Sequence, residues 1–183
     1  QGTVGLEFVE QVRSMAPTSG GHGPLHLDAI IVPVGGGGLL SGVGVAAKGL
    51  CPGIRIIGAE PEGADDASRS KASGTLQGLK EGQPDTLADG LKTVLGSHTW
   101  PIVRDVVDEI VTVKEGEILR WMAVIYQRLK LVIEPSAVVG VAALMSEGVK
   151  SRPGLERVGV VLCGGNVSIT QLIDLLARVE EEK

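Results

Sequence analysis

Four consecutive glycines, Gly35–Gly38, are the residues of this sequence best suited to hold a ligand. They follow the apolar run 29–34, which predicts a buried strand, and they precede the run 39–50, which predicts a helix. Residues without Cβ let consecutive backbone N–H groups converge on one anion, and the start of a helix adds a favourable dipole. A tight turn of purely steric origin is the alternative, but so many glycines exceed what a turn needs. The pattern therefore favours a phosphate-binding loop.

A second polar turn, Cys163-Gly164-Gly165-Asn166, follows the apolar run 158–162. The Cys163 thiol has three conceivable roles: a nucleophile, a partner for a ring nitrogen, or core filling. A nucleophilic cysteine needs a nearby base, and none of the three histidines has an evident link to this turn. The residues alone therefore favour core filling.

Glu60, Ala64 and Asp66 form a third group at the end of the expected strand 54–59. Two carboxylates and a turn carbonyl are hard oxygen ligands that suit Mg²⁺ or Ca²⁺. The alternative is that Asp65 or Asp66 caps the helix expected over 67–72, with Glu60 solvated at the strand end. From spacing alone, this alternative is favoured over a metal.

Glu134 stands where an apolar run meets the start of a helix. It follows Leu131, Val132 and Ile133 and precedes Pro135, which is typical of the first helical turn. This position allows its carboxylate to face a cleft, although the residue by itself is weak evidence for a site.

The elements that must position these residues alternate along the chain. Strands are expected at 29–34, 54–59, 109–113 and 158–162, and helices at 4–12, 39–50, 67–72, 102–107, 115–130, 137–150 and 168–180. Loops are expected at 14–24 and 73–101. This alternation predicts an α/β fold with a doubly wound, mostly parallel sheet.

Composition excludes several classes of protein. The chain has 183 residues, 27 glycines, a net charge of −5 and 2% aromatic residues. The length suits one domain, and an acidic chain with few aromatics argues against a nucleic-acid partner. No apolar run approaches the roughly 20 residues that span a membrane. Two cysteines, Cys51 and Cys163, are too few for a disulfide scaffold, so we expect a cytoplasmic protein.

Six segments, taken in order, resemble a known family: PVGGGGLLSGV, IGAEPEGADD, LADGLKT, TWPIVRD, LVIEPSAVVGVAAL and VLCGGNV. They resemble the C-terminal half of the fold-type II pyridoxal-phosphate enzymes, whose large domain has the tryptophan synthase β-like fold. The closest group is eukaryotic serine racemase with its serine/threonine dehydratase relatives. The resemblance runs from Gln1 to about Ile169.

The resemblance implies roles for matching positions. Gly35, Gly36, Gly37 and Gly38 would hold the phosphate of pyridoxal 5′-phosphate, and Cys163 would face its pyridine nitrogen. A neutral partner there would leave that nitrogen unprotonated and weaken the ring as an electron sink. The other implied positions are Glu134 and Asn166 near the cofactor, and Asp89 and Gly90 near an amino-acid substrate, serine or threonine.

The same resemblance reverses the preference against a metal. It implies that Glu60, the Ala64 carbonyl and Asp66 bind Mg²⁺ or Ca²⁺. It also implies that Lys130 and Asn166 contact activating ATP between the subunits of a homodimer.

One departure from the family pattern sets the expected activity. The family's Schiff-base lysine lies in an N-terminal Ser-Phe-Lys-x-Arg-Gly segment that this sequence does not contain. We therefore expect residues 1–183 to be the C-terminal portion of the large domain, inactive until an N-terminal portion completes the enzyme. One alternative is a non-catalytic fragment or paralogue that serves as an anion-binding or subunit-interaction module. Another is a nucleotide-binding Rossmann domain in which Glu60 contacts a ribose.

Overall fold

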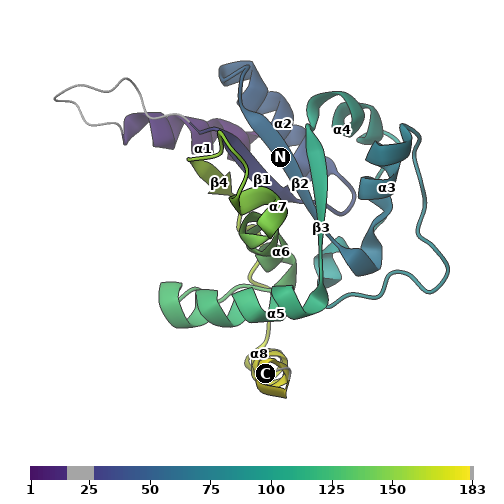
Figure 1. Cartoon of the computed structure of the whole chain (residues 1–183), viewed down its shortest axis with the longest axis vertical. Helices are drawn as coiled ribbons and strands as arrows, with labels where there is room; N and C mark the ends of the chain where they lie inside the picture. Colours follow the sequence, from purple (N-terminus) through teal and green to yellow (C-terminus); the bar gives the residue numbers. More distant parts are fainter. Residues whose placement is uncertain (16–26, 182–183) are drawn as a thin grey trace.

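The chain folds around a four-stranded parallel sheet. The computed structural model describes residues 1–15 and 27–181, so most of the loop expected at 14–24 lies outside the described residues. The strands follow the order β3-β2-β1-β4 (Figure 1). Their bounds are β1 Ala29–Pro33, β2 Arg55–Pro61, β3 Glu109–Val113 and β4 Val158–Val160.

Helices precede, connect and follow these strands. The helices are α1 Gly2–Ser14, α2 Gly38–Leu50, α3 Asp66–Ser73, α4 Trp100–Val106, α5 Glu115–Val124, α6 Pro135–Met145, α7 Glu147–Lys150 and α8 Ile169–Glu181. Two 3-10 turns, η1 Glu62–Ala64 and η2 Asp89–Leu91, and one π-helical turn, η3 Ile125–Leu129, complete the described elements. The expected α/β fold with a parallel sheet is confirmed.

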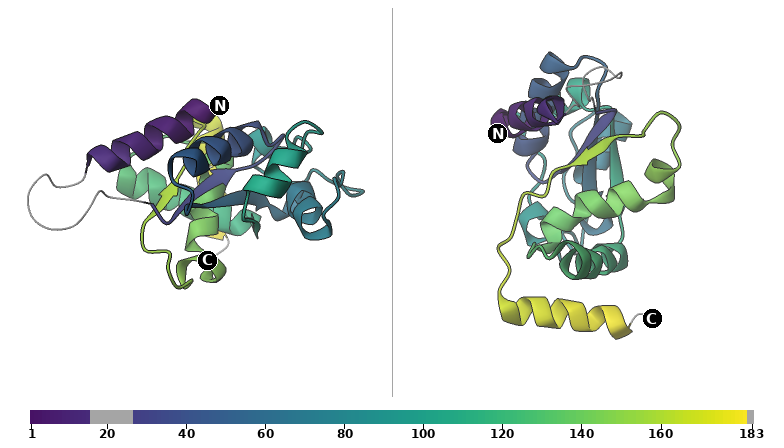
Figure 2. Two further views of the ribbon diagram at one scale, coloured as in Figure 1. Left: turned by 90° about the horizontal axis from the view of Figure 1, so that it is seen from above. Right: turned by 90° about the vertical axis from the view of Figure 1, so that its left-hand side faces the viewer.

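Both faces of the sheet are buried, which explains its continuous apolar runs. Successive side chains of a strand point to opposite faces. Ile30 and Val32 accordingly pack with residues of α2 and α4, whereas Ile31 packs with residues of α5 and α6. Helix α8 lies beyond α5, away from the sheet (Figure 2).

Two expected helices are interrupted. The helix expected over 115–130 ends at Val124, where the backbone widens into the π-helical turn, and Lys130 then adopts a left-handed conformation with φ 59°. The helix expected over 137–150 begins earlier, at Pro135, and breaks at Ser146. There the Ser146 hydroxyl donates to the Ala143 carbonyl oxygen at 2.7 Å, a local bond that competes with helix continuation.

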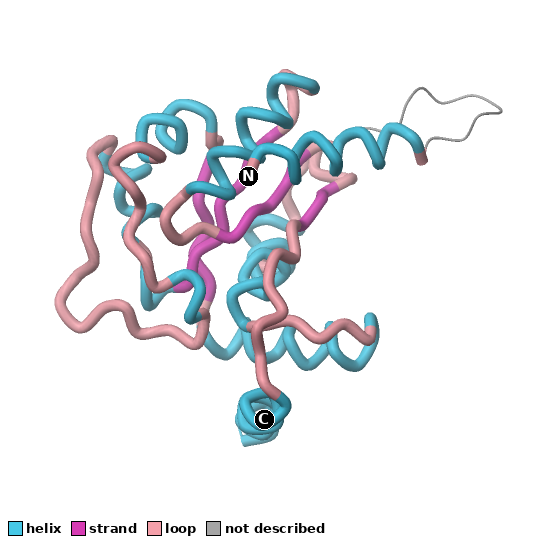
Figure 3. The backbone as a smooth tube through the Cα atoms, turned by 180° about the vertical axis from the view of Figure 1, so that it is seen from behind, coloured by secondary structure: helices cyan, strands magenta, loops and turns pink. Residues whose placement is uncertain are grey.

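The segment between α3 and α4 is irregular, as expected, apart from η2. Figure 3 shows it as a long loop along one side of the molecule. The remaining differences are small: α4 begins at Trp100 and β4 ends at Val160. Of the described helices, none has the length and apolar content that crossing a membrane requires.

Candidate functional site

The candidate site lies at β1, where successive strands of the chain stop adding to one side of the sheet and a later strand adds to the other. From β1 the chain proceeds to β2 and then β3 on one side, whereas β4 pairs with β1 on the other. In parallel sheets, ligands bind in the crevice outside the carboxyl ends of strands at such a switch point. Gly35–Gly38 follow β1, and the turn 163–166 follows β4. The topology therefore brings the two glycine-rich turns to one edge.

The Gly35–Gly38 loop has free backbone donors. None of its four N–H groups donates a hydrogen bond to a described residue. Packing demands two of the glycines: Gly37 has φ +82°, and a Cβ on Gly35 would lie 2.8 Å from the Thr93 hydroxyl oxygen. A Cβ on Gly38 would meet nothing within 4 Å, and one on Gly36 only atoms at 3.9 Å. The glycines thus leave open space beside unpaired amides, which fits a phosphate group.

The far side of this loop is held by residues 96–99, of which only Thr99 belongs to a segment that carries the family resemblance. The carbonyl oxygen of Gly36 accepts hydrogen bonds from Gly96 N at 3.2 Å and from the Thr99 hydroxyl at 2.7 Å. These bonds orient the Gly36 carbonyl toward 96–99, and they fix the loop without using its N–H groups.

Gly90 lies between the glycine loop and the start of α6. Its N–H donates to the Ser136 hydroxyl oxygen at 3.0 Å, and its carbonyl oxygen is 3.3 Å from where a Cβ on Gly35 would stand. A Cβ on Gly90 would lie 3.3 Å from Glu134 Oε1. The sequence missed Ser136 as a bonding partner, because its partner lies 46 positions earlier in the chain.

Glu134 joins the start of α6 to the turn after β4. Its Oε2 accepts a hydrogen bond from Asn166 N at 2.8 Å, and its own N–H donates to the Gly164 carbonyl oxygen at 3.1 Å. A Cβ on Gly164 would lie only 2.5 Å from the Glu134 carboxyl carbon. Only glycine at position 164 therefore allows this contact.

Cys163 is exposed, so the core-filling interpretation is wrong. The reason is that β4 ends at Val160, and Cys163 lies beyond the sheet in the following turn. Partial desolvation and the nearby charge of Glu134 raise the pKa of the Cys163 thiol. A neutral thiol is a poor nucleophile but suits a neutral partner for a ring nitrogen.

A cavity of about 830 Å³ opens beside these contacts. Four predicted residues line it: Asp89, Gly90, Glu134 and Asn166. Lys92 also lines it and pairs with Asp89 at 2.6 Å. The sequence missed the contribution of α8, which supplies Gln171, Asp174 and Leu175. Lys130 is exposed and absent from this lining, so the cavity does not bring Lys130 and Asn166 together.

The predicted cation group is buried, which overturns the alternative for Glu60. Both Glu60 and Asp66 are 1% exposed. Glu60 accepts hydrogen bonds from Ala67 N at 3.0 Å and Ser68 N at 2.8 Å, so it satisfies the first amides of α3 itself. It is therefore not solvated, and it is not free to contact a ribose.

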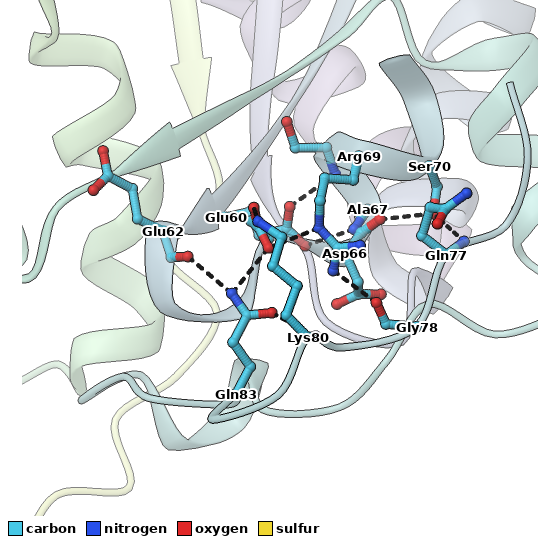
Figure 4. A network of polar contacts seen from close by, with 12 residues as sticks. Glu60, Glu62, Asp66, Ala67, Arg69, Ser70, Gln77, Gly78, Lys80 and Gln83 are labelled. Atoms are coloured by element: carbon cyan, nitrogen blue, oxygen red, sulfur yellow. Dashed lines mark hydrogen bonds and ion pairs between the residues drawn. The ribbon is translucent and has the colours of Figure 1, made fainter. Parts of the chain in front are cut away.

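Neither aspartate caps α3 through its side chain. Asp66 Oδ2 accepts from Leu95 N at 2.7 Å. The Asp65 carboxylate accepts from Arg69, Lys80 and Gln83, three residues that Figure 4 labels around this turn. Burial opposes these three bonds to Asp65, but together they hold the pKa of that carboxyl well below its usual range.

Neither buried carboxylate of this group forms a direct ion pair with a described residue, although the charge of Arg69 acts on Asp66 from a distance. Burial raises the pKa of Glu60 to about 8, and it also raises the pKa of Asp66. No described Lys or Arg forms an ion pair with either carboxylate. Buried carboxylates without a direct ion pair are donors that a hard divalent cation stabilises. The part of the chain that is described contains no cluster of three or more His, Cys, Asp or Glu placed to hold a metal, so the set depends on the Ala64 carbonyl.

Comparison with known proteins agrees with this arrangement. The model of the family described as "Pyridoxal-phosphate dependent enzyme" matches residues 1–164. A serine racemase of Arabidopsis thaliana is 45% identical over 177 residues, which are 95% of this chain and 49% of that protein. The crystal structure of serine racemase from Dictyostelium discoideum superposes with a TM-score of 0.81 at 43% identity, covering 92% of this chain and 50% of that one.

A crystal structure of a threonine deaminase from T.th. gives the same TM-score, 0.81, at 39% identity, over 92% of this chain and 56% of that one. The resemblance predicted from the six segments is therefore confirmed, as is the fold of the fold-type II enzymes. The chain spans about half the length of the curated relatives it matches. From the family match, the arrangement of the sheet edge and these similarities, we conclude that the chain belongs to the pyridoxal-phosphate dependent enzyme family.

Proposed function

We propose that residues 1–183 form the C-terminal portion of the cofactor-binding large domain of a serine racemase that also dehydrates serine and threonine. One observation carries the proposal. The segments that contain Gly35, Gly90, Glu134 and Gly164 touch one another at the carboxyl edge of β1 and β4. Such a convergence fits one ligand with a phosphate at one end and a ring at the other.

Bound pyridoxal phosphate supplies an electron sink that weakens the bond between Cα and its hydrogen in an amino acid. This chain contributes the surroundings. The N–H groups of Gly35–Gly38, which donate to no described residue, would bind the phosphate, and the neutral thiol of Cys163 would be the partner of the ring nitrogen without protonating it. Glu134 fixes Asn166 and Gly164 beside it. Asp89 and Gly90 form the wall of the cavity that faces the amino acid.

The lysine that bonds the cofactor is proposed to come from the N-terminal portion of the protein. Lys92 is the one lysine on the described lining of the cavity, and an ion pair with Asp89 occupies it. The sequence context that the family uses for this lysine is absent from residues 1–183. The acid or base on the opposite side of the substrate is assigned to that N-terminal portion as well.

Mg²⁺ or Ca²⁺ is proposed to bind Glu60, the Ala64 carbonyl and Asp66. The support is the burial of two carboxylates that have raised pKa values and form no direct ion pair with a described residue. ATP binding by Lys130 and Asn166, a homodimer and a cytoplasmic location stay predictions from the sequence.

Product analysis on the complete protein tests the proposal. Given L-serine, pyridoxal phosphate and Mg²⁺, it should form D-serine, measured by chiral chromatography, and pyruvate, measured with lactate dehydrogenase and NADH. Residues 1–183 alone should form neither.

Matched glycine variants connect the activity to the loop. Gly36→Ala should lose visible cofactor absorbance, whereas Gly49→Ala should keep it, because a Cβ at position 49 meets nothing within 4 Å. A complete protein that binds inorganic phosphate but forms neither product would support the non-catalytic module instead.

A further inference from the structure

The Asp65 carboxylate holds a distant loop against the turn that supplies the cation ligands. It accepts hydrogen bonds from Lys80 Nζ at 2.9 Å and Gln83 Nε2 at 3.0 Å, both in the segment 77–85 (Figure 4). Arg69 Nε also donates to it at 2.9 Å, and Arg69 Nη2 donates to the Gly78 carbonyl oxygen at 2.7 Å. Asp65 therefore gathers three donors from two elements.

The same segment also fixes the backbone of the turn 62–66. Gln83 Nε2 donates to the Glu62 carbonyl oxygen at 3.4 Å, and Asp85 N donates to the Gly63 carbonyl oxygen at 2.9 Å. A Cβ on Gly63 would stand 1.6 Å from the Asp85 carbonyl oxygen, so the two backbones are in direct contact. These contacts restrain the two carbonyls that immediately precede Ala64, whose own carbonyl is a proposed ligand.

Beyond Asp85 the segment leads directly into the wall of the cavity. Leu87 N donates to Glu115 Oε2 at 2.8 Å, and Gly90 N donates to the Ser136 hydroxyl oxygen at 3.0 Å. Ala88 is fully buried between these bonds. Only a few residues thus separate the contacts of Asp65 from Asp89 and Gly90. A shift of the segment 77–85 would change the cavity.

We propose that Lys80 and Gln83 are positioning residues that act through Asp65. Docking of the segment 77–85 on Asp65 arranges the turn 62–66 for the cation, and the bound cation in return holds the segment and the Asp89–Gly90 wall in place. The inference rests on the cation site and the amino-acid cavity of the proposed function. Coupling between two binding events is reciprocal. If the bound cation strengthens docking of the segment by a given factor, loss of the docking contacts must weaken cation binding by the same factor.

Simple electrostatics makes the opposite prediction for Lys80. Lys80 pairs with Asp65, which lies between two of the proposed cation ligands, Ala64 and Asp66. Lys80 therefore places a positive charge close to the proposed cation site. Removal of a positive charge near a cation site should strengthen binding of the cation if charge alone mattered. The sign of the change in affinity therefore separates positioning from charge.

Calorimetric titration of the full chain with CaCl₂, and separately with MgCl₂, tests the inference. Lys80→Met should raise the dissociation constant by about fivefold or more, Gln83→Ala should also raise it, and Lys80→Arg should restore it. Lys150→Met is the matched control, because Lys150 pairs with Glu147 on α7 and should leave the affinity unchanged. Lys80 is 55% exposed in its side chain, so its replacement leaves the core intact.

Amide hydrogen exchange supplies the second readout. The cation should slow exchange at Gln83 and Asp85, whose N–H groups bond to Lys80 O and Gly63 O, and this slowing should be lost in Lys80→Met. Equal or tighter cation binding by Lys80→Met would overturn the coupling and leave the site standing. Failure of the unaltered chain to bind either cation would overturn the site and the coupling together.

Discussion

Glu60 should make the stability of the cation-free protein fall as the pH rises. Burial is the largest cause that raises its pKa from 4.5 to about 8; the Asp66 and Asp65 charges add to it, and the Ser68 and Ala67 amides oppose it. Because the folded-state pKa is above the unfolded value, the folded protein holds this proton more tightly. The stabilisation is complete below a pH of about 4.5 and is lost as the pH rises through about 8.

The structure also sets the size of this loss. One pKa unit corresponds to about 1.4 kcal/mol, so the shift from 4.5 to about 8 gives an upper limit of about 5 kcal/mol. Glu60 is 1% exposed, so solvent screens this difference little. Urea unfolding in the presence of a chelator, followed by tryptophan fluorescence from pH 5 to pH 8.5, should show the free energy of unfolding falling by about 2–4 kcal/mol.

A saturating divalent cation should remove most of this fall, since it replaces the proton as the partner of the carboxylate. Glu60→Gln should have a much flatter profile with or without the cation. The matched control is Glu62→Gln, an exposed neighbour that should follow the unaltered protein. The reasoning would be refuted by an unaltered protein whose stability is constant or rises over this range in the chelator.

Three further measurements test other contacts of the site. Gly37→Ala should lower the free energy of unfolding by about 1–3 kcal/mol in urea, because φ is +82° and the new Cβ would lie 2.5 Å from Leu95 Cδ1. The control Gly38→Ala should lower it by much less, because a Cβ there meets nothing within 4 Å. Ser136→Ala should cost about 1–2 kcal/mol by the same assay, since it leaves the Gly90 N–H without its acceptor; an unchanged unfolding midpoint would contradict that bond. In a Cys51→Ser background, alkylation of Cys163 by iodoacetamide should be slow at neutral pH and accelerate in alkaline buffer, and Glu134→Gln should shift this acceleration to lower pH.

The elements and their order were predictable because their signals are local. Each strand is a short apolar run, and the glycines after β1 and after β4 directly follow such runs. Parallel pairing then brings the ends of neighbouring strands to one edge. The π-helical turn 125–129 was not predictable, since it replaces one helical hydrogen-bond pattern by another. The break at Ser146, where the backbone becomes extended, was not predictable either, since no Gly or Pro stands at that position.

The burial of Glu60 could not be predicted for a different reason. From the sequence, a glutamate at a strand end is expected in solvent, with an aspartate capping the next helix. In the structure, Glu60 bonds amides seven and eight positions later, and Asp66 bonds an amide 29 positions later. The Asp66 bond depends on how the segment 74–95 returns to α3, and the Glu60 bonds depend on how the turn 62–66 folds α3 back onto the end of β2. The family resemblance singled out this group as a cation site, which stays a prediction, and only the contacts explain why its carboxylates stay out of water.

Several glycines of the site are required by contacts between segments rather than by the turns in which they lie. Gly35 leaves room for Gly90, Gly90 leaves room for Glu134 and Ser136, and Gly164 leaves room for the Glu134 carboxylate. Each of these contacts joins segments that are far apart in the sequence, so a side chain at any one of these positions would push two of the segments apart. Gly38 is different, because nothing within 4 Å would meet a Cβ there. Gly36 is nearly as open, and the amides of both glycines donate to no described residue. Open space beside such amides lets a ligand approach the backbone, so the contrast of Gly36 and Gly38 with the tightly packed Gly35 and Gly37 is the structural argument for the proposed phosphate site.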